Sequence, residues 1–333
     1  MKSVIVRLSV VCLCLGVACA TAFGAEDGAQ WLMKINNAAR QLNYEGTFVY
    51  VQGNRVESMR VTHRAHGGSM RQRIYSLNGA PREVIRDDKQ IWCYIPDRKV
   101  GVHEYRRVSK EGFPNLLPQA VDHLVKYYKV YKGAEGRLAD RRAQQIMVLP
   151  KDDFRYGYDL WADEKSGLLL KAVLLDHDKH PIEQYLFTSV DIGGDIPESE
   201  LEPVTPKDDL VWYGDAQGGD SSEESGSSSD MSAGHWVIGR VPAGFMLTRK
   251  IKRLSPMRAR VVEHYVYSDG LASVSVFVQA IDKGDHRARI NGINKMGAVH
   301  AFGREINGHQ ITVVGEVPSQ TVDLIGMSVS PKE

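Results

Sequence analysis

The first regular apolar spacing in the chain lies near its N-terminal end. Between residues 29 and 42, apolar side chains recur every three or four positions, at Trp31, Leu32, Ile35, Ala38, Ala39 and Leu42. This spacing places them on one face of a helix with about 3.6 residues per turn. The pattern therefore predicts an amphipathic helix whose apolar face packs on a core.

After this helix the spacing changes to that of strands joined by tight turns. Residues 73–77 and 82–86 flank Asn78-Gly79, a pair that adopts the positive φ of a hairpin turn with little strain. Further strand-like stretches follow at 154–160, 168–175 and 181–190. Consecutive hairpins after a helix predict an antiparallel sheet that curves around the helices covering it.

An apolar loop interrupts this series of strands. Residues 112–118 read Gly-Phe-Pro-Asn-Leu-Leu-Pro, and a helix is predicted directly after them, at 119–127. Phe113, Leu116 and Leu117 are candidates for a lid over a concave sheet face, or for the lining of a lipid pocket. A loop packed onto its own core fits the same residues equally well, and the sequence does not decide between the two.

The last hundred residues predict a second, smaller α+β unit. Strands are expected at 261–267, 271–280 and 310–314. Pro318 then precedes a short helix that carries Val322 and Ile325.

Between the two halves lies a segment of low complexity. Residues 214–234 contain five acidic residues and one long apolar side chain, Met231, among mostly Gly and Ser. Such a segment cannot bury enough apolar surface to offset the entropy of ordering it, so we expect a flexible tether. The predicted organisation is a signal peptide at 1–24, a large domain at 25–205, a flexible linker at 206–234 and a small domain at 235–333.

The N-terminal residues have the pattern of a secretory signal peptide. Lys2 and Arg7 precede an apolar run over 8–20, which is too short to span a bilayer and is followed by small residues. We expect a periplasmic protein that is soluble after cleavage and does not span the membrane. The alternative is a lipoprotein acylated at Cys19. However, the residue three places before this cysteine is Gly16, not the Leu-like residue expected there.

Charge and cysteine content further limit the partners and the thiol chemistry expected of the chain. The chain has 333 residues, a formal net charge of +1 and 25% charged residues, so no global charge draws it to nucleic acid or to a membrane surface. Three of the four cysteines lie in the predicted signal peptide. The fourth, Cys93, lies in the apolar strand 91–95 and is predicted to be an inert buried thiol.

Four segments carry a specific resemblance. They read LNYE at 42–45, REVI at 82–85, YVYSDGL at 265–271 and ITVVGEVPSQT at 311–321. With them the chain resembles the RseB/MucB family of periplasmic negative regulators of the envelope-stress sigma factor, collinearly over nearly its whole mature length. The hairpin WADEKSGL at 161–168 also resembles the lipoprotein carriers LolA and LolB.

The resemblance implies both a fold and a role. The fold is α+β: a large antiparallel open half-barrel with covering helices, a flexible linker and a small C-terminal α+β domain. Its concave apolar face would hold lipid. The role is to bind the periplasmic part of a single-pass anti-sigma factor and to shield it from regulated proteolysis, with release when lipid or lipopolysaccharide-like amphiphiles accumulate. The linker is longer and more acidic than the family leads us to expect.

No motif in the chain indicates catalysis, so we predict no enzyme, no catalytic residues, no cofactor and no metal site. His177-Asp178-Lys179-His180 precedes Pro181 between two strands, which favours a solvated turn over a metal centre because no third ligand is close in sequence. The sequence contains no nucleophile elbow and no phosphate-binding glycine loop.

One cluster of charge departs from the near-neutral background. Arg249, Lys250, Lys252, Arg253, Arg258 and Arg260 are six bases within twelve residues that contain no acid. They are candidates for docking an acidic partner or the phosphate of a lipid, which arginine binds through paired hydrogen bonds. The alternative is an edge strand whose charges block unwanted strand pairing.

Two functions remain open from the sequence. The first is the regulatory binding protein just described. The alternative is a periplasmic lipid or lipoprotein carrier. A carrier needs only the large domain, so the second domain and its family-like segments favour the regulator.

Overall fold

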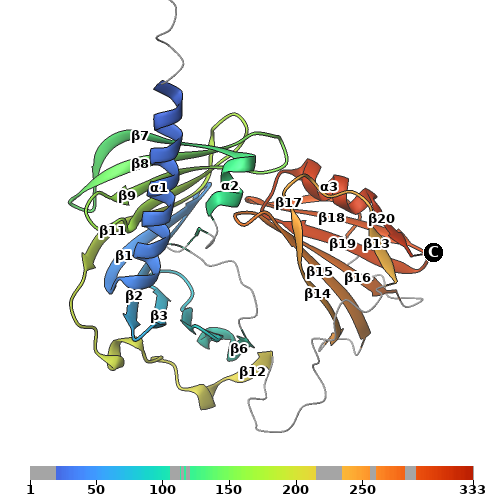
Figure 1. Ribbon diagram of the computed structural model, residues 1–333. Helices are drawn as coiled ribbons and strands as arrows, with labels where there is room; N and C mark the ends of the chain where they lie inside the picture. Colours follow the sequence, from blue (N-terminus) through green and yellow to red (C-terminus); the bar gives the residue numbers. More distant parts are fainter. Residues whose placement is uncertain are drawn as a thin grey trace, which may run out of the picture.

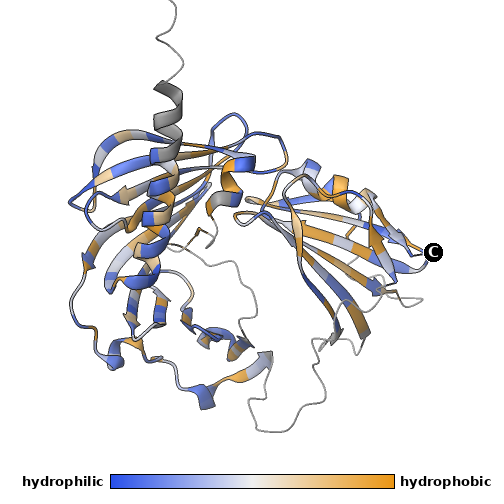
Figure 2. Cartoon of the chain, in the orientation of Figure 1, coloured by the Kyte–Doolittle hydropathy of each residue, from blue (hydrophilic) through white to orange (hydrophobic). Residues whose placement is uncertain are grey.

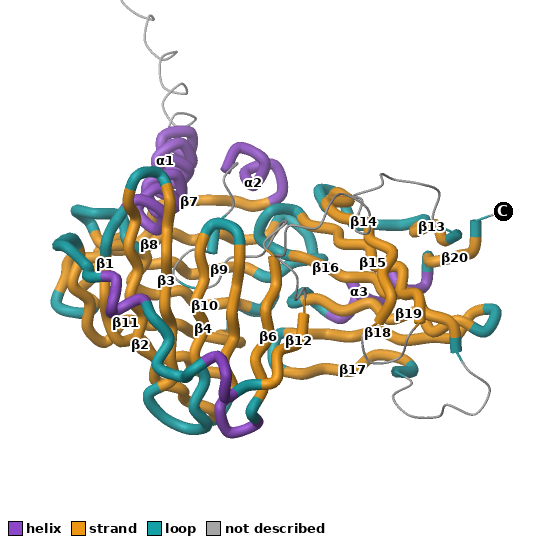
Figure 3. Tube along the Cα trace, turned by 90° about the horizontal axis from the view of Figure 1, so that it is seen from below, coloured by secondary structure: helices purple, strands orange, loops and turns teal. Residues whose placement is uncertain are grey.

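The computed structural model describes residues 20–105, 113, 116–117, 121–214, 235–255, 260–281 and 290–332. These residues form a large sheet with α1 and α2 on one side of it, and a smaller sheet next to it (Figure 1). Strands make up most of the described trace (Figure 3). Within the described ranges, no helix combines the length and the apolar content that crossing a bilayer would require. Most of the predicted signal peptide lies outside these ranges.

The larger unit is a twelve-stranded sheet in the order β12-β6-β5-β4-β3-β2-β1-β11-β10-β9-β8-β7. Its strands are β1 (Tyr44–Gln52), β2 (Arg55–His66), β3 (Ser69–Ser76), β4 (Glu83–Asp87), β5 (Gln90–Ile95), β6 (Val100–Tyr105), β7 (Tyr128–Leu138), β8 (Arg141–Pro150), β9 (Gly157–Asp163), β10 (Leu169–Leu175), β11 (Pro181–Ile192) and β12 (Val211–Gly214). Neighbouring strands are antiparallel except β12, which runs parallel to β6.

The sheet is curved but does not close. Its end strands, β12 and β7, do not pair with each other, and Figure 1 shows the sheet wrapped partly around α1 (Ala20–Gln41). Leu32 and Ile35 of α1 pack in one cluster with Tyr44 and Phe48 of β1, which marks the concave face as the core side. The predicted fold class, an open antiparallel half-barrel with covering helices and a small α+β domain, is confirmed.

The outer face of the sheet is partly covered by the chain that follows β11. A short helix, η2 (Glu198–Leu201), lies against β2 and β3, and Glu198 forms ion pairs with both Arg64 and Arg71. Another, η3 (Lys207–Asp209), leads into β12. Ordered structure therefore extends to at least Gly214, inside the range 206–234 that the sequence predicts to be a linker.

The smaller unit is a six-stranded sheet in the order β14-β15-β16-β19-β18-β17. Its strands are β14 (Met246–Ser255), β15 (Arg260–Ser268), β16 (Ser273–Ala280), β17 (Gly292–Met296), β18 (Val299–Ile306) and β19 (His309–Gly315). The helix α3 (Ser319–Met327) buries Val322 and Ile325 against one face, as its sequence predicts. Next to it, β13 (Trp236–Ile238) pairs with β20 (Val329–Pro331). Apolar stretches recur along the strands of both sheets in Figure 2.

The strand predicted at 154–160 is partly wrong. The strand β9 begins only at Gly157, and Phe154 to Tyr156 belong to the loop before it. The apolar–polar alternation misleads here because Arg155, which it assigns to the solvent side, is 0% exposed. By contrast, β3 and β4 pair on either side of Asn78-Gly79, and Gly79 has a φ of +72°, so the predicted hairpin is confirmed.

Candidate functional site

Apolar side chains of the loop singled out in the sequence pack on the concave face of the large sheet. Phe113 is 3% exposed and Leu117 is 4% exposed, and Leu116 packs against the same cluster. The ring of Phe113 stacks on Tyr185, with 5.4 Å between ring centroids, and lies 5.3 Å from Phe48 and 5.2 Å from Phe187. These three loop residues therefore pack on the concave face as part of its core cluster.

The same face carries a row of buried polar side chains toward its β4 side. The register places His63 opposite both Tyr44 and Gln72, and Gln72 opposite Arg86. The rings of His63 and Tyr44 stack at 4.6 Å, and Gln72 donates a hydrogen bond of 3.1 Å to the Tyr44 hydroxyl. Burial lowers the pKa of His63 to about 4, with a smaller contribution from the Arg86 charge. Sequence reasoning missed this row because polar residues in a strand ordinarily indicate a solvent face.

A buried ion pair joins the two domains. Arg155, in the loop before β9, places Nη1 2.8 Å from Oδ2 of Asp269 in the turn between β15 and β16, and both side chains are 0% exposed. The guanidinium also donates to Oδ1 of Asp152, at 3.0 Å, and to the carbonyl oxygen of Ala243. We call this arrangement, with Tyr128, the interdomain joint.

Aromatic rings and one hydroxyl complete the interdomain joint. The Tyr128 hydroxyl donates to Asp269 Oδ2 at 2.9 Å, and burial together with the Asp269 charge raises the pKa of Tyr128 well above its ordinary value. The tyrosine thus stays a neutral donor. The guanidinium carbon of Arg155 lies 5.0 Å from the ring centroids of both Tyr127 and Phe245, within the range of cation–π attraction.

Further contacts extend the boundary between the domains. Leu271 of the small domain belongs to the core cluster of the large one. Thr321 at the start of α3 donates a 2.7 Å hydrogen bond to the carbonyl of Phe154. The hydroxyl oxygen of Tyr156 lies 3.3 Å from Nδ1 of His300. The two domains are therefore packed against each other through buried groups. No local signal in the sequence shows this, because the hydrogen-bonded residues of the two domains are at least 88 positions apart in the chain.

Four residues of the basic cluster lie on β14, an edge strand of the small sheet, and Arg260 begins the neighbouring strand β15. Register places Arg249 opposite Val266 and Lys250 opposite Tyr265, so neighbouring bases point to opposite sides of the sheet. The ammonium of Lys250 lies 5.5 Å from the centroid of the Tyr265 ring, and Lys252 is exposed. Arg260 pairs with Ser255 through the backbone. Arg258 and the side chains of Arg253 and Arg260 lie outside the described residues.

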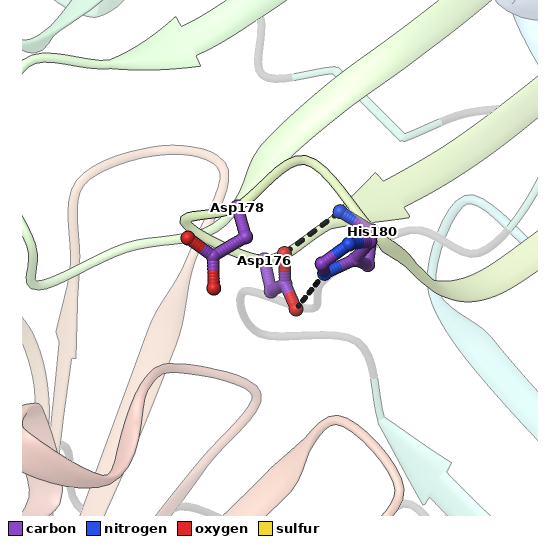
Figure 4. Close-up of side chains that lie close together, drawn as sticks. All are labelled: Asp176, Asp178 and His180. Atoms are coloured by element: carbon purple, nitrogen blue, oxygen red, sulfur yellow. Dashed lines mark hydrogen bonds and ion pairs between the residues drawn. The ribbon is translucent and has the colours of Figure 1, made fainter.

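The turn between β10 and β11 brings together three potential metal ligands. Ligand atoms of Asp176, Asp178 and His180 all lie within 4.8 Å of one another (Figure 4). His177, part of the motif in the sequence, is not among them. Asp176 already accepts a 2.8 Å hydrogen bond from the His180 backbone N–H and lies 3.5 Å from its Nδ1. Asp178 and His180 are exposed. The third potential ligand, which the sequence argument did not count, is Asp176, directly before the motif.

The remaining thiol of the predicted mature chain lies on β5. The sequence predicts a buried thiol at this position, but Cys93 is only half-buried. Burial raises the pKa of its thiol, so the thiolate that reacts with oxidants is disfavoured.

Comparison with known proteins gives matches over both domains. Residues 27–205 match the family model of the MucB/RseB N-terminal domain, and residues 230–330 match that of the MucB/RseB C-terminal domain. The sigma factor AlgU regulatory protein MucB of Pseudomonas aeruginosa is 28% identical over 314 residues, which cover 92% of each chain. The sigma-E factor regulatory protein RseB of Escherichia coli K12 is 27% identical and covers 90% of this chain and 89% of its own.

Solved structures match the fold over the same length. A crystal structure of MucB in complex with MucA(peri) has a TM-score of 0.67 and 27% identity, and covers 92% of this chain and 100% of its own. The complex of Pseudomonas aeruginosa MucA and MucB has a TM-score of 0.69 and 28% identity, covering 92% and 99%.

Proposed function

The chain belongs to the MucB/RseB family, and on that premise we propose that it is a periplasmic regulatory protein that binds the periplasmic part of a membrane-spanning anti-sigma factor. While bound, it protects that segment from regulated proteolysis and so restrains the envelope-stress sigma factor. The observation that carries the proposal is the end-to-end match, through both domains, to MucB structures solved with MucA. The names of the curated relatives describe regulatory proteins rather than enzymes.

The proposal is tested by a protection assay with the purified full-length mature protein. The periplasmic part of the cognate anti-sigma factor is incubated with the protease that initiates its cleavage, with and without a saturating amount of this protein. We expect cleavage to slow at least about tenfold, as a complex with a dissociation constant well below the protein concentration would require. An unrelated protein of similar size serves as the control. Equal cleavage rates with both additions would refute the proposal.

A lipid carrier remains the second candidate, and the partner it retains separates the two. Protein isolated from a periplasmic and inner-membrane extract should retain one single-pass anti-sigma factor if it is a regulator, and a mixture of lipoproteins if it is a carrier. The interdomain joint favours the regulator. A carrier built on the large sheet alone has no need of a second domain that contributes Leu271 to its core and Asp269 to its buried ion pair.

We further propose that the concave face is the sensor. Phe113, Leu116 and Leu117 act as its lid, and an amphiphile acts by placing an acyl chain where the Phe113 ring now lies against Tyr185. Around Phe113 this face is apolar and aromatic, which suits an acyl chain. Occupancy then disfavours the state that binds the anti-sigma factor.

Because coupling between two binding sites is reciprocal, the sensor makes a quantitative prediction. A saturating amount of the anti-sigma segment should lower the affinity of the protein for dodecanoate by a certain factor. Saturating dodecanoate should lower the affinity for the segment by the same factor, which is about 5 to 150 in typical proteins. Calorimetric titration with and without the partner measures both factors. Phe113→Ala should bind dodecanoate more tightly than wild type, because the acyl chain no longer has to displace a ring. The matched control is Val56→Ala, an exposed apolar residue on β2. Equal affinities with and without partner would exclude this face as the switch.

The basic edge of the small sheet is proposed to speed capture of an anionic group, whether an acidic segment of the partner or a lipid phosphate. Replacing Arg249, Lys250, Lys252 and Arg253 by Ser should slow association more than it speeds dissociation, because long-range charge attraction acts mainly on the association rate. The difference in association rate between this variant and the wild type should become smaller at high salt, since the Debye length is already about 8 Å at physiological ionic strength. Stopped-flow rates at two salt concentrations measure it. If the charges only protect an edge strand, association stays at the wild-type rate and the variant aggregates more readily.

A further inference from the structure

The short helix α2 (Val121–Tyr127) shares a core cluster with the lid residues and contacts the second domain. At its start, Val121 and Leu124 are buried in the cluster that contains the lid residues Phe113 and Leu117. At its end, Tyr127 and the next residue, Tyr128, are part of the interdomain joint. A single element of seven residues therefore takes part in the core cluster of the lid residues and also lies against the second domain.

The contact between α2 and the second domain leaves little free space. Gly244 has a φ of +91°, and a Cβ atom built there would lie 2.6 Å from Cε2 of the Tyr127 ring. The carbonyl oxygen of Gly244 is 3.3 Å from Nε2 of His123. Because the backbone of the second domain lies directly on the helix, α2 cannot shift toward it without displacing it.

The buried ion pair makes this contact sensitive to small displacements. Arg155 and Asp269 are both fully buried, so separating them without admitting water leaves an uncompensated charge in the interior. Intermediate separations are therefore costly, and the joint favours two arrangements: closed, or open and hydrated. Two discrete arrangements are what coupling between distant sites requires.

We propose that α2 and the interdomain joint form a relay between the lid and the second domain. An acyl chain that displaces Phe113 disturbs the core cluster in which Val121 and Leu124 hold α2, which loosens the contacts of Tyr127 and Tyr128 with Gly244 and Asp269. The second domain then moves relative to the first. This inference rests on the proposed sensor function of the concave face, and it identifies the residues through which occupancy of that face reaches the rest of the molecule.

The relay is tested by measuring the distance between the domains and the affinity for dodecanoate in the same variants. Spin labels at Lys89→Cys, in the exposed turn before β5, and Ser330→Cys, on β20, report the interdomain distance in a Cys93→Ser background. Asp269→Asn removes the charge facing Arg155 but keeps an oxygen for the turn amides of Leu271 and Ala272. Tyr128→Phe is a milder variant that removes only the hydroxyl. The matched control is Glu263→Gln, a buried carboxylate of β15 that bonds Tyr265 and His235 away from the joint.

The relay predicts that the interdomain distance and the affinity for dodecanoate change together in the wild type and its variants. Wild type and Glu263→Gln should show one narrow distance distribution, which saturating dodecanoate broadens or shifts. Asp269→Asn and Tyr128→Phe should show the altered distribution without dodecanoate, and Asp269→Asn should bind dodecanoate at least about fivefold more tightly, because the coupling works in both directions.

Other outcomes would overturn the relay in distinguishable ways. An altered distance with unchanged dodecanoate affinity would mean that the joint only holds the domains together, while the sensor proposal stands. A narrow distribution in both joint variants would show that Arg155 and Asp269 do not fix the domains. If dodecanoate bound none of the proteins, the sensor and the relay would fail together.

Discussion

Replacing Asp269 by Asn is expected to lower the free energy of unfolding by about 3 kcal/mol, because it leaves the Arg155 guanidinium buried without its main counter-charge. Removing one partner of a buried ion pair typically costs about 3 to 5 kcal/mol, and the lower end applies here because Asp152 still lies 3.0 Å from Arg155 Nε. Urea unfolding followed by tryptophan fluorescence measures the loss. The loss should far exceed that of Glu198→Gln, which weakens only part-exposed pairs with Arg64 and Arg71.

A double variant separates the charge from the rest of the contact. Arg155→Met combined with Asp269→Asn removes both charges and keeps an apolar stem between Tyr127 and Phe245. Such a replacement is often neutral or stabilising, so the double variant should be more stable than Asp269→Asn alone. If it is less stable than the single variant, the joint contributes through its hydrogen bonds and not through charge pairing, and the unpaired charge is not what destabilises Asp269→Asn.

Much of the local structure could be predicted from short-range pattern. The helix at 29–42, the hairpin at Asn78-Gly79 and the C-terminal helix after Pro318 all depend on interactions between near neighbours in the chain, and the structure has each of them. The family resemblance, carried by segments spread over the chain, is confirmed by the matches to both MucB/RseB domains.

The pairing of distant strands could not be predicted in the same way. β1 pairs with β11, some 130 residues later, and β12 joins β6 in parallel after the chain has crossed the outer face. Neither pairing leaves a mark on local spacing, because a strand looks the same whichever partner it has. The same reason hides Arg155: in sequence it alternates like a solvent-facing residue, and its burial depends on a domain that begins about eighty residues later.

The row of buried polar side chains on the concave face shows a second limit of predicting structure from the hydrophobic pattern. His63 and Gln72 face the core side of the sheet, where the alternation rule expects apolar residues. The candidate lid was found because its apolar residues stand between prolines. The row has no comparable signal, since its members come from four different strands and become neighbours only through register.

Burial of His63 makes the stability of the protein depend on pH in a defined window. The pKa of His63 is about 4 in the folded protein and 6.5 in an unfolded chain, because burial disfavours the charged ring. Between these two values the unfolded state binds a proton that the folded state does not, so stability falls as the pH is lowered from about 6.5 to 4. The difference of the two pKa values corresponds to a total loss of about 3 kcal/mol, complete below pH 4.

The comparison with a His63→Gln variant isolates this contribution from carboxylates that titrate in the same range. Glutamine keeps a side-chain donor that can bond the Leu42 carbonyl, which His63 Nδ1 contacts at 2.9 Å, but it carries no titrating group. The free energy of unfolding of the wild type minus that of the variant should therefore be constant above pH 7 and decrease steadily between pH 6.5 and 4. A difference that stays flat down to pH 4 would mean that His63 accepts a proton in the folded state as readily as in water, which its stacking on Tyr44 inside the core makes unfavourable.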